Sequence, residues 1–352
     1  GERGVDFSGT LRDYQAQAIE AAKSAGCGVI QAPTGSGKTV IAMGLVAALK
    51  TPTLIMVHTT VLLDQTAEKT REFLKTEPAI IGAGRYETGD VTIAMVQTLT
   101  TRGYKEIADR FGLVILDEAH HCPAVTFKEV VQEFPARYRI GLTATPTRKD
   151  RLHPVLYDTI GRIIHKIDQQ RLVDDGRLVK ARFFKIPTAF KYSYRKNYQR
   201  MINRLTADYD RNNLVIATIA ETHKGKSLVL SERIDHCALL STLLAKKGVA
   251  SVLMTGKTAK EEREKLLEDF RGAEKGILIS TTSLIGEGFD LPDLDTIYLT
   301  VPNGSPQKTT QILGRIMRPS SAEKDARIFD FADELIPVLK NQFLKRAKIY
   351  NR

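Results

Sequence analysis

The chain has 352 residues, of which 42% are hydrophobic and 26% are charged. These values are typical of a soluble globular protein, and the length favours two or three domains. No apolar run approaches the roughly 20 residues of a membrane-spanning helix, and the N-terminal residues lack the apolar stretch of a signal peptide. We therefore expect no membrane partner and a cytoplasmic location, close to the nucleoid if the source is prokaryotic or viral.

Charge and cysteine usage narrow the function classes further. The formal net charge of +11 favours a polyanionic partner, because basic side chains release counterions from phosphates. Cys27, Cys122 and Cys237 lie far apart in the sequence and form no CxxC pair. A disulfide framework or a cysteine-rich zinc site is therefore not expected, and we interpret each cysteine as a small buried hydrophobic residue.

Residues 1–165 alternate short apolar runs with amphipathic segments, which indicates a first α/β domain. The apolar runs predict strands at Gly28–Ala32, Thr53–His58, Val91–Val96, Leu113–Asp117 and Arg139–Ala144. The amphipathic segments predict helices at Leu11–Ser24, Thr39–Leu49 and Thr60–Leu74. This alternation is typical of a parallel sheet with helices on both faces.

Residues 166–210 are interpreted as a connection, with a strand at Ala181–Ile186 and a piece rich in tyrosine and basic residues at Tyr192–Arg204. Residues 211–352 repeat the alternation and predict a second α/β domain. Its predicted strands are Ser227–Leu230, Ser251–Met254, Gly276–Ser280, Thr296–Val301 and Arg327–Phe331. Its predicted helices are Asn213–Thr222, Asp235–Lys247, Lys260–Arg271 and Gln307–Met317.

The last predicted helix, Glu334–Tyr350, is amphipathic. Its apolar face carries Leu335, Leu339, Phe343 and Ala347, and its other face carries Lys340, Lys345, Arg346 and Lys348. We expect a packing helix with a solvated basic face, and the alternative is a nucleic-acid contact.

A phosphate-binding loop is the clearest functional motif. The segment Ala32–Thr39 follows a predicted strand and opens a helix, as such a loop requires. Its glycines let backbone N–H groups turn toward phosphates, Lys38 can reach the terminal phosphates, and Thr39 can ligate Mg²⁺. The candidate nucleotide-binding residues are Pro33, Thr34, Gly35, Ser36, Gly37, Lys38 and Thr39.

An acidic pair at the end of a predicted buried strand is the second functional motif. Asp117-Glu118-Ala119-His120 follows Leu113–Leu116, where a carboxylate is costly unless it has a cation or a function. Beside a phosphate loop, Asp117 would hold Mg²⁺ together with Thr39, and Glu118 would activate the attacking water. His120 and His121 have no third ligand at a useful spacing, so we do not expect zinc.

The phosphate loop followed by Asp-Glu-Ala-His resembles superfamily 2 helicases. The resemblance implies two tandem RecA-like parallel-sheet lobes with a nucleotide cleft between them, ATP and Mg²⁺ as cofactors, and a nucleic-acid partner. Leu11–Gln15 is similar to the family segment that recognises adenine, which makes Arg12 and Gln15 candidate nucleotide-binding residues. Thr143–Pro146 is similar to the family's third motif, which links hydrolysis to nucleic-acid contact.

The C-terminal half is similar to later motifs of the same family. In Thr281–Asp290 the resemblance implies that Thr282 touches the nucleic-acid backbone and that Gly288 and Asp290 face the nucleotide. In Gln311–Arg318 it implies catalytic roles for Gln311, Arg315 and Arg318, with the two arginines acting on the γ-phosphate as arginine fingers.

A further group is expected beside the nucleic-acid strand. The segment Val57–Gln65 is similar to the family motif that follows the phosphate loop. Each candidate is also a plausible helix cap, so that alternative stays open. The candidates for phosphate contacts are Thr59, Thr60, Gln65, Gln97 and Thr98.

Three segments are similar in sequence to the XPB/Ssl2 and phage UvsW-like DNA helicases: Asp117–Pro123, Gly141–Asp150 and Gly314–Pro319. XPB-type chains often carry Arg-Glu-Asp where this chain has Arg-Lys-Asp at residues 148–150. The resemblance implies an ATP-dependent DNA helicase or translocase, monomeric as a core, that acts on duplex or branched DNA in repair or fork remodelling. Alternatives are an RNA-dependent ATPase, an ATP-binding switch module, and the motor of a restriction or defence complex.

Overall fold

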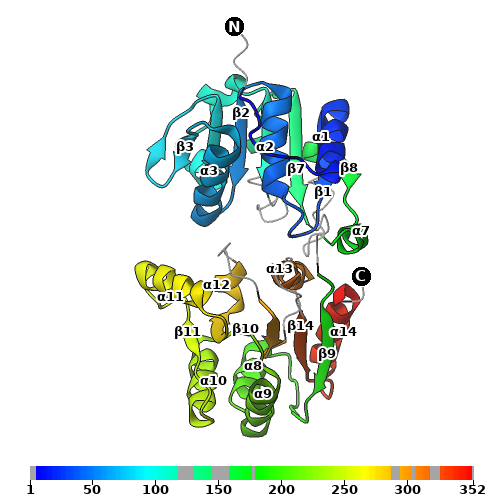
Figure 1. The fold of residues 1–352 in the computed structure, drawn as a ribbon, viewed down its shortest axis with the longest axis vertical. Helices are drawn as coiled ribbons and strands as arrows, with labels where there is room; N and C mark the ends of the chain where they lie inside the picture. The colour runs from blue at the N-terminus through cyan, green and yellow to red at the C-terminus, as the bar shows by residue number, and fades with distance from the viewer. Residues whose placement is uncertain are drawn as a thin grey trace. The chain divides into compact units, whose positions relative to one another are not determined.

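The computed structural model describes residues 5–117, 130–144, 158–176, 179–286, 294–302, 306–317 and 326–350. The chain divides into two compact units, Gly1–Asp168 and Gln169–Arg352 (Figure 1). Each unit is built on its own, largely parallel sheet, so the predicted pair of α/β domains is confirmed. No helix in the described ranges is long and apolar enough to cross a lipid bilayer.

The first unit contains an eight-stranded sheet in the order β4-β3-β5-β2-β6-β7-β1-β8, in which only β3 and β4 pair antiparallel. Its strands are β1 (Cys27–Gln31), β2 (Thr53–Val57), β3 (Ala79–Gly82), β4 (Arg85–Tyr86), β5 (Val91–Met95), β6 (Leu113–Asp117), β7 (Tyr138–Thr143) and β8 (Ile163–Lys166). Its helices are α1 (Asp13–Ala25), α2 (Lys38–Leu49), α3 (Thr60–Leu74), α4 (Val96–Arg102) and a 3₁₀ helix (Lys105–Arg110).

Burial explains why the central strands of this sheet read as continuous apolar runs. Every residue of β2 and β6 is buried, as expected for parallel strands covered on both faces. Leu54, Met56 and Val114 belong to a core cluster that includes Val96 and Leu99 of α4. Successive strand residues point to opposite faces, and the other face of these two strands is covered by α2 and α3.

The second unit contains a six-stranded, all-parallel sheet in the order β11-β12-β10-β13-β14-β9. Its strands are β9 (Arg182–Pro187), β10 (Lys226–Ser231), β11 (Val252–Met254), β12 (Gly276–Thr281), β13 (Thr296–Leu299) and β14 (Arg327–Ala332). Its helices are α7 (Gln169–Asp174), α8 (Tyr198–Thr206), α9 (Tyr209–Thr222), α10 (Ile234–Lys246), α11 (Lys260–Gly272), α12 (Thr282–Gly286), α13 (Pro306–Ile316) and α14 (Pro337–Tyr350).

Most of the stretch that we interpreted as a connection, residues 166–210, packs within the second unit. The unit boundary falls between Asp168 and Gln169. The strand β9, predicted one residue earlier, pairs with β14 as the edge strand of the second sheet. Met201, Ile202 and Leu205 of α8 bury their apolar face against a small core that includes Val301, Ile336 and Leu339.

The C-terminal helix departs from the prediction at Arg346. We expected this residue on a solvated basic face, but it is 2% exposed and its guanidinium donates to both carboxylate oxygens of Asp330 at 2.7 and 2.8 Å. Tyr350 donates its hydroxyl to the same carboxylate at 3.0 Å. Arg346 lies three residues after Phe343 and seven after Leu339, and therefore shares their buried face. Leu335, expected on the apolar face, precedes the helix and is 56% exposed.

Candidate functional site

The phosphate loop and Asp117 lie at the same edge of the first sheet. The loop connects β1 to α2, and Asp117 ends β6, with only β7 between these two strands. The backbone N–H of Ala32 donates to the carbonyl of Thr143 at the end of β7 at 2.9 Å. Asp117 is 8% exposed and pairs in register with Leu142. The carboxyl ends of parallel strands are where open α/β sheets bind ligands, so the residues predicted for ATP and Mg²⁺ meet at the expected edge.

Two glycines give the loop its shape. Gly35 and Gly37 have φ values of 87° and 81°, in the left-handed region that favours glycine. Gly37 is the residue before the first turn of α2. A Cβ added to it would lie 2.6 Å from Nε2 of Gln15. The sequence therefore needs glycine at this position both for its backbone conformation and for the approach of α1.

The interior of the loop has the features of a phosphate site. The hydroxyl oxygens of Thr34 and Ser36 are buried and have no hydrogen-bond partner among the described residues. A buried hydroxyl without a partner is costly, and a phosphate oxygen would accept from it. Lys38 and Thr39 begin α2, where the helix N-terminus also favours an anion. The Thr39 hydroxyl and the Asp117 carboxylate are oxygen ligands of the kind that Mg²⁺ prefers. These residues thus fit ATP and its metal ion.

The helix α1 fixes the orientation of the loop backbone. The carbonyl of Ser36 accepts hydrogen bonds from the Tyr14 hydroxyl and from Nε2 of Gln15, both at 3.1 Å. The Tyr14 hydroxyl accepts from the Arg12 guanidinium at 3.0 Å, and the Gln15 amide oxygen accepts from the Arg12 backbone N–H at 3.0 Å. The sequence pattern led us to expect Arg12 and Gln15 near the nucleotide but did not reveal Tyr14 as a third member.

The candidates for nucleic-acid contact in the first unit gather at the ends of two adjacent strands. Because β2 and β5 are parallel neighbours, Thr59 and Gln97 lie at the same edge. Gln97 donates its amide to the carbonyl of His58 at 3.2 Å, and Thr60 places its hydroxyl 3.8 Å from the Met95 sulfur.

The helix-cap alternative is confirmed for one of these candidates. The Thr59 hydroxyl caps α3 by accepting from the Leu62 N–H at 3.2 Å. Thr98 follows Gln97 in α4, whereas Gln65 lies further along α3. The structure thus brings Thr59, Thr60, Gln97 and Thr98 together and places Gln65 behind them.

In the second unit the Thr282 side chain turns inward. It is 6% exposed, and its hydroxyl donates to the carbonyl of Ser231, at the end of β10, at 3.3 Å. The next residue, Ser283, is exposed and also bonds the Thr281 hydroxyl. At this position the exposed hydroxyl is that of Ser283, which the sequence did not single out.

A buried histidine network supports the same strand end. The Ser231 hydroxyl lies 2.9 Å from Nδ1 of His236, and Nε2 of His236 lies 3.0 Å from the Asn212 amide oxygen. Burial, with a smaller contribution from the charge of Arg211, lowers the pKa of His236 to about 3. His236 is therefore neutral near pH 7 and acts as a fixed hydrogen-bonding group. The sequence carried no signal for this network, because its members come from separate elements.

The remaining predicted site residues are only partly within the described structure. Gln311 and Arg315 lie four positions apart in α13, a spacing that puts two positions on one helix face. The other predicted residues lie outside the described ranges; they are Glu118, Gly288, Asp290 and Arg318.

Each of the two units matches a family of known proteins. Residues 8–148 match the family described as type III restriction enzyme, res subunit, and residues 210–320 match the helicase conserved C-terminal domain. The DNA 3'-5' translocase XPB2 of Sulfurisphaera tokodaii is 28% identical over 355 residues, covering 89% of this chain and 80% of that protein. The DNA 3'-5' helicase XPB of Kineococcus radiotolerans is 28% identical over 335 residues, covering 91% of this chain and 59% of that protein.

A solved structure agrees with the fold. The Hef helicase domain of Pyrococcus furiosus superposes with a TM-score of 0.62 at 14% identity, covering 96% of this chain and 98% of that chain. The matched region spans 80% of the length of the first XPB relative and 59% of the second. With a phosphate loop and a strand-end aspartate in one unit, a helicase C-terminal domain matched in the other, and XPB relatives aligned over most of its length, the chain is a superfamily 2 helicase core with a RecA-like fold, similar to XPB.

Proposed function

We propose that this chain couples ATP hydrolysis to movement along, or remodelling of, duplex or branched DNA. The observation that carries the proposal is the phosphate loop, with its left-handed glycines and its buried, unpartnered Thr34 and Ser36 hydroxyls. The names of the XPB relatives, a DNA translocase and a DNA helicase, support DNA as the polymer. The net charge of +11 is of the sign that nucleic-acid phosphates attract.

The catalytic roles follow from the chemistry of each residue type. Lys38 and the loop N–H groups would bind the phosphates, and Thr39 and Asp117 would hold Mg²⁺, which would neutralise charge on the phosphate oxygens. Glu118 takes a proton from the attacking water. We assign Gln311, Arg315 and Arg318 to the γ-phosphate, where the planar guanidinium groups stabilise charge on several oxygens at once.

Nucleic-acid contact is assigned to the strand ends. Thr59, Thr60, Gln97 and Thr98 are hydroxyl and amide groups at one sheet edge, suited to phosphate oxygens. In the second unit, the exposed Ser283 replaces Thr282 as our candidate, because the Thr282 hydroxyl is bonded to Ser231. Contacts of this kind position the protein on the backbone and give little sequence specificity.

The test is ATP hydrolysis at low salt with no polymer, single-stranded DNA, duplex DNA, forked DNA, four-way DNA and RNA of matched length. We expect strong stimulation by DNA and little by RNA. The matched control is Glu118→Gln, which should bind ATP but not turn it over, since it lacks the base. Stimulation by RNA alone would refute the DNA assignment, and absence of turnover with every polymer would refute the motor itself.

A second candidate function is the motor of a restriction complex. The family description for residues 8–148 favours it. Such a motor would move on duplex DNA without separating the strands. Displacement of a triplex-forming oligonucleotide without unwinding of a fork would support this candidate, and unwinding of the fork would support a helicase.

A further inference from the structure

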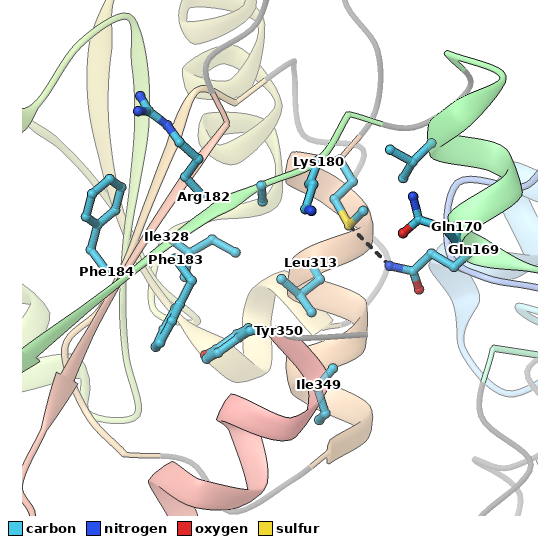
Figure 2. Close-up of a pocket in the computed structure, with 13 residues that line it drawn as sticks. Gln169, Gln170, Lys180, Arg182, Phe183, Phe184, Leu313, Ile328, Ile349 and Tyr350 are labelled. Carbon is cyan, nitrogen blue, oxygen red and sulfur yellow. Dashed lines mark hydrogen bonds between the residues drawn. The ribbon is translucent and has the colours of Figure 1, made fainter.

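The second unit contains a pocket of about 720 Å³ at one corner of its sheet. It lies at the amino ends of β9 and β14, where α7, α13 and the last residues of α14 form its walls (Figure 2). Thr282 and Ser231 lie at the carboxyl ends of strands in the same parallel sheet. The pocket is therefore at the opposite edge from the candidate nucleic-acid contacts.

The walls are mainly apolar and aromatic. The rings of Phe183 and Tyr350 stack with centroids 4.2 Å apart. Phe183 and Ile328 pair in register across β9 and β14, so their side chains share one face of the sheet. Leu313 lies across the pocket from Phe183 (Figure 2), and Met317 also lines the pocket. A planar ring would find stacking partners and aliphatic contacts here.

The charged side chains that line the pocket, Lys180 and Arg182, are both basic. Lys180 extends beside Leu313, while Gln169 and Gln170 approach from α7 (Figure 2). Arg182 turns the other way, with its guanidinium carbon 5.8 Å from the Phe184 ring centroid. None of the described residues that line the pocket is acidic. The nearby Asp330 carboxylate is already bonded to Arg346 and Tyr350.

We propose that this pocket binds a small molecule that combines an aromatic ring with an anionic group. Its volume lies within the roughly 300–1,000 Å³ of ligand pockets, which are mostly apolar with a few placed polar groups. The ring would pack against Phe183 and Tyr350, the anion would pair with Lys180, and the Gln169 amide would bond a polar ring edge. A cationic ligand is disfavoured, because it would meet Lys180 with no carboxylate to offset the repulsion.

Occupancy would act on a helix that carries predicted catalytic residues. Leu313 and Met317 line the pocket, and Gln311 and Arg315 lie in the same helix, α13. Gln169 donates its amide to the Met317 sulfur at 3.5 Å, which links α7 to the end of that helix. An effect of the ligand on ATP turnover rests on the proposed function, whereas binding itself does not.

The probes are AMP and its uncharged counterpart adenosine, titrated by calorimetry into the full chain carrying Lys38→Ala, which weakens the phosphate loop. We expect saturable AMP binding and about tenfold weaker binding of adenosine. Lys180→Glu and Lys180→Met should each weaken AMP by about tenfold or more. The matched control is Lys246→Glu, an exposed lysine of the same unit at the end of α10, which should leave AMP affinity unchanged.

The outcomes separate this proposal from the motor assignment. Absence of saturable AMP binding, or AMP binding that survives both Lys180 substitutions, would overturn the pocket proposal. Binding of adenosine as tight as that of AMP would overturn its anionic part. If the wild-type chain hydrolyses no ATP but AMP binding still depends on Lys180, the motor fails and the pocket stands. Thermal unfolding of each variant checks that the fold is intact.

Discussion

Removal of the Tyr14 hydroxyl tests how α1 prepares the phosphate loop. In a trans peptide the carbonyl of Ser36 and the N–H of Gly37 point in opposite directions. Because Tyr14 and Gln15 hold that carbonyl toward α1 at 3.1 Å, the N–H of Gly37 is directed away from α1. We infer that this pair pre-orients one of the N–H groups that bind phosphate. Tyr14→Phe removes one of the two bonds to this carbonyl together with the bond from the Arg12 guanidinium, and it removes no ring contact.

The size of the effect follows from the bonds that remain. A protein hydrogen bond contributes about 0.5–1.5 kcal/mol net, and Ser36 keeps its bond from Gln15, so no buried carbonyl is left without a partner. We expect a loss of about 1 kcal/mol, or about fivefold in ATP affinity. The N–H of Gly37 would contact phosphate in both the ground and the transition state. The KM for ATP should therefore rise while kcat changes little.

The control is another tyrosine of the same unit with the same chemistry. Tyr86 donates its hydroxyl to the Gly103 carbonyl at 2.6 Å, far along the sheet order from the loop. Tyr86→Phe should leave ATP affinity unchanged in equilibrium binding and in steady-state hydrolysis. Wild-type affinity in Tyr14→Phe, or an equal loss in both variants, would refute the bracing argument.

Three further expectations concern the stability contributions of Arg346, His236 and Gly37. Arg346→Met should lower the free energy of unfolding by about 3–5 kcal/mol, because it leaves the buried Asp330 carboxylate without its charged partner. Adding Asp330→Leu should restore part of this loss, as measured by urea titration. His236 has a folded pKa of about 3, below the unfolded value of about 6.5, so its contribution to the free energy of unfolding is complete above pH 6.5 and is lost as pH falls toward 3. His236→Gln should therefore make the free energy of unfolding vary less with pH over this range than it does in the wild type. Gly37→Ala should lower the free energy of unfolding by about 1–2 kcal/mol through its left-handed φ alone, and by more because the new Cβ would meet the Gln15 side chain. Adding Gln15→Ala should remove the steric part of this loss but not the backbone part, as measured by chemical unfolding.

The central strands could be predicted from the sequence because strands that are buried on both faces consist almost entirely of apolar residues. Thr53–Val57 and Leu113–Asp117 are buried at every position and appear in the sequence as unbroken apolar runs. Exposed edge strands lack such an apolar run. Ile163–Lys166 and Arg85–Tyr86 are short and exposed or half-buried, and no strand was predicted at either place. The element boundaries that were predicted are correct to a few residues, and of the three strands that were not predicted, β3, β4 and β8, the last two are sheet edges.

The nucleotide loop was predictable for a different reason. Its chemistry is local, since Gly35, Gly37 and Lys38 act within one short segment whose spacing is itself the signal. The position of Arg346 was misjudged because its partner, Asp330, lies on a separate strand. An arginine at helical spacing from apolar residues is compatible with either a solvated or a buried face. Only the strand that packs against it decides between the two.

The Gln15 side chain has enough hydrogen-bonding groups both to hold the Ser36 carbonyl and to bond the edge of adenine. An amide side chain has two N–H donors and two lone pairs on its oxygen. The described bonds use one donor, to the Ser36 carbonyl, and one lone pair, from the Arg12 N–H. One of each is enough for the donor and acceptor on the edge of adenine. If Gln15 serves both, the base and the phosphate loop share a single side chain, and the geometry of the loop then depends on which base is bound. Gln15 thereby offers a physical route from base identity to phosphate binding.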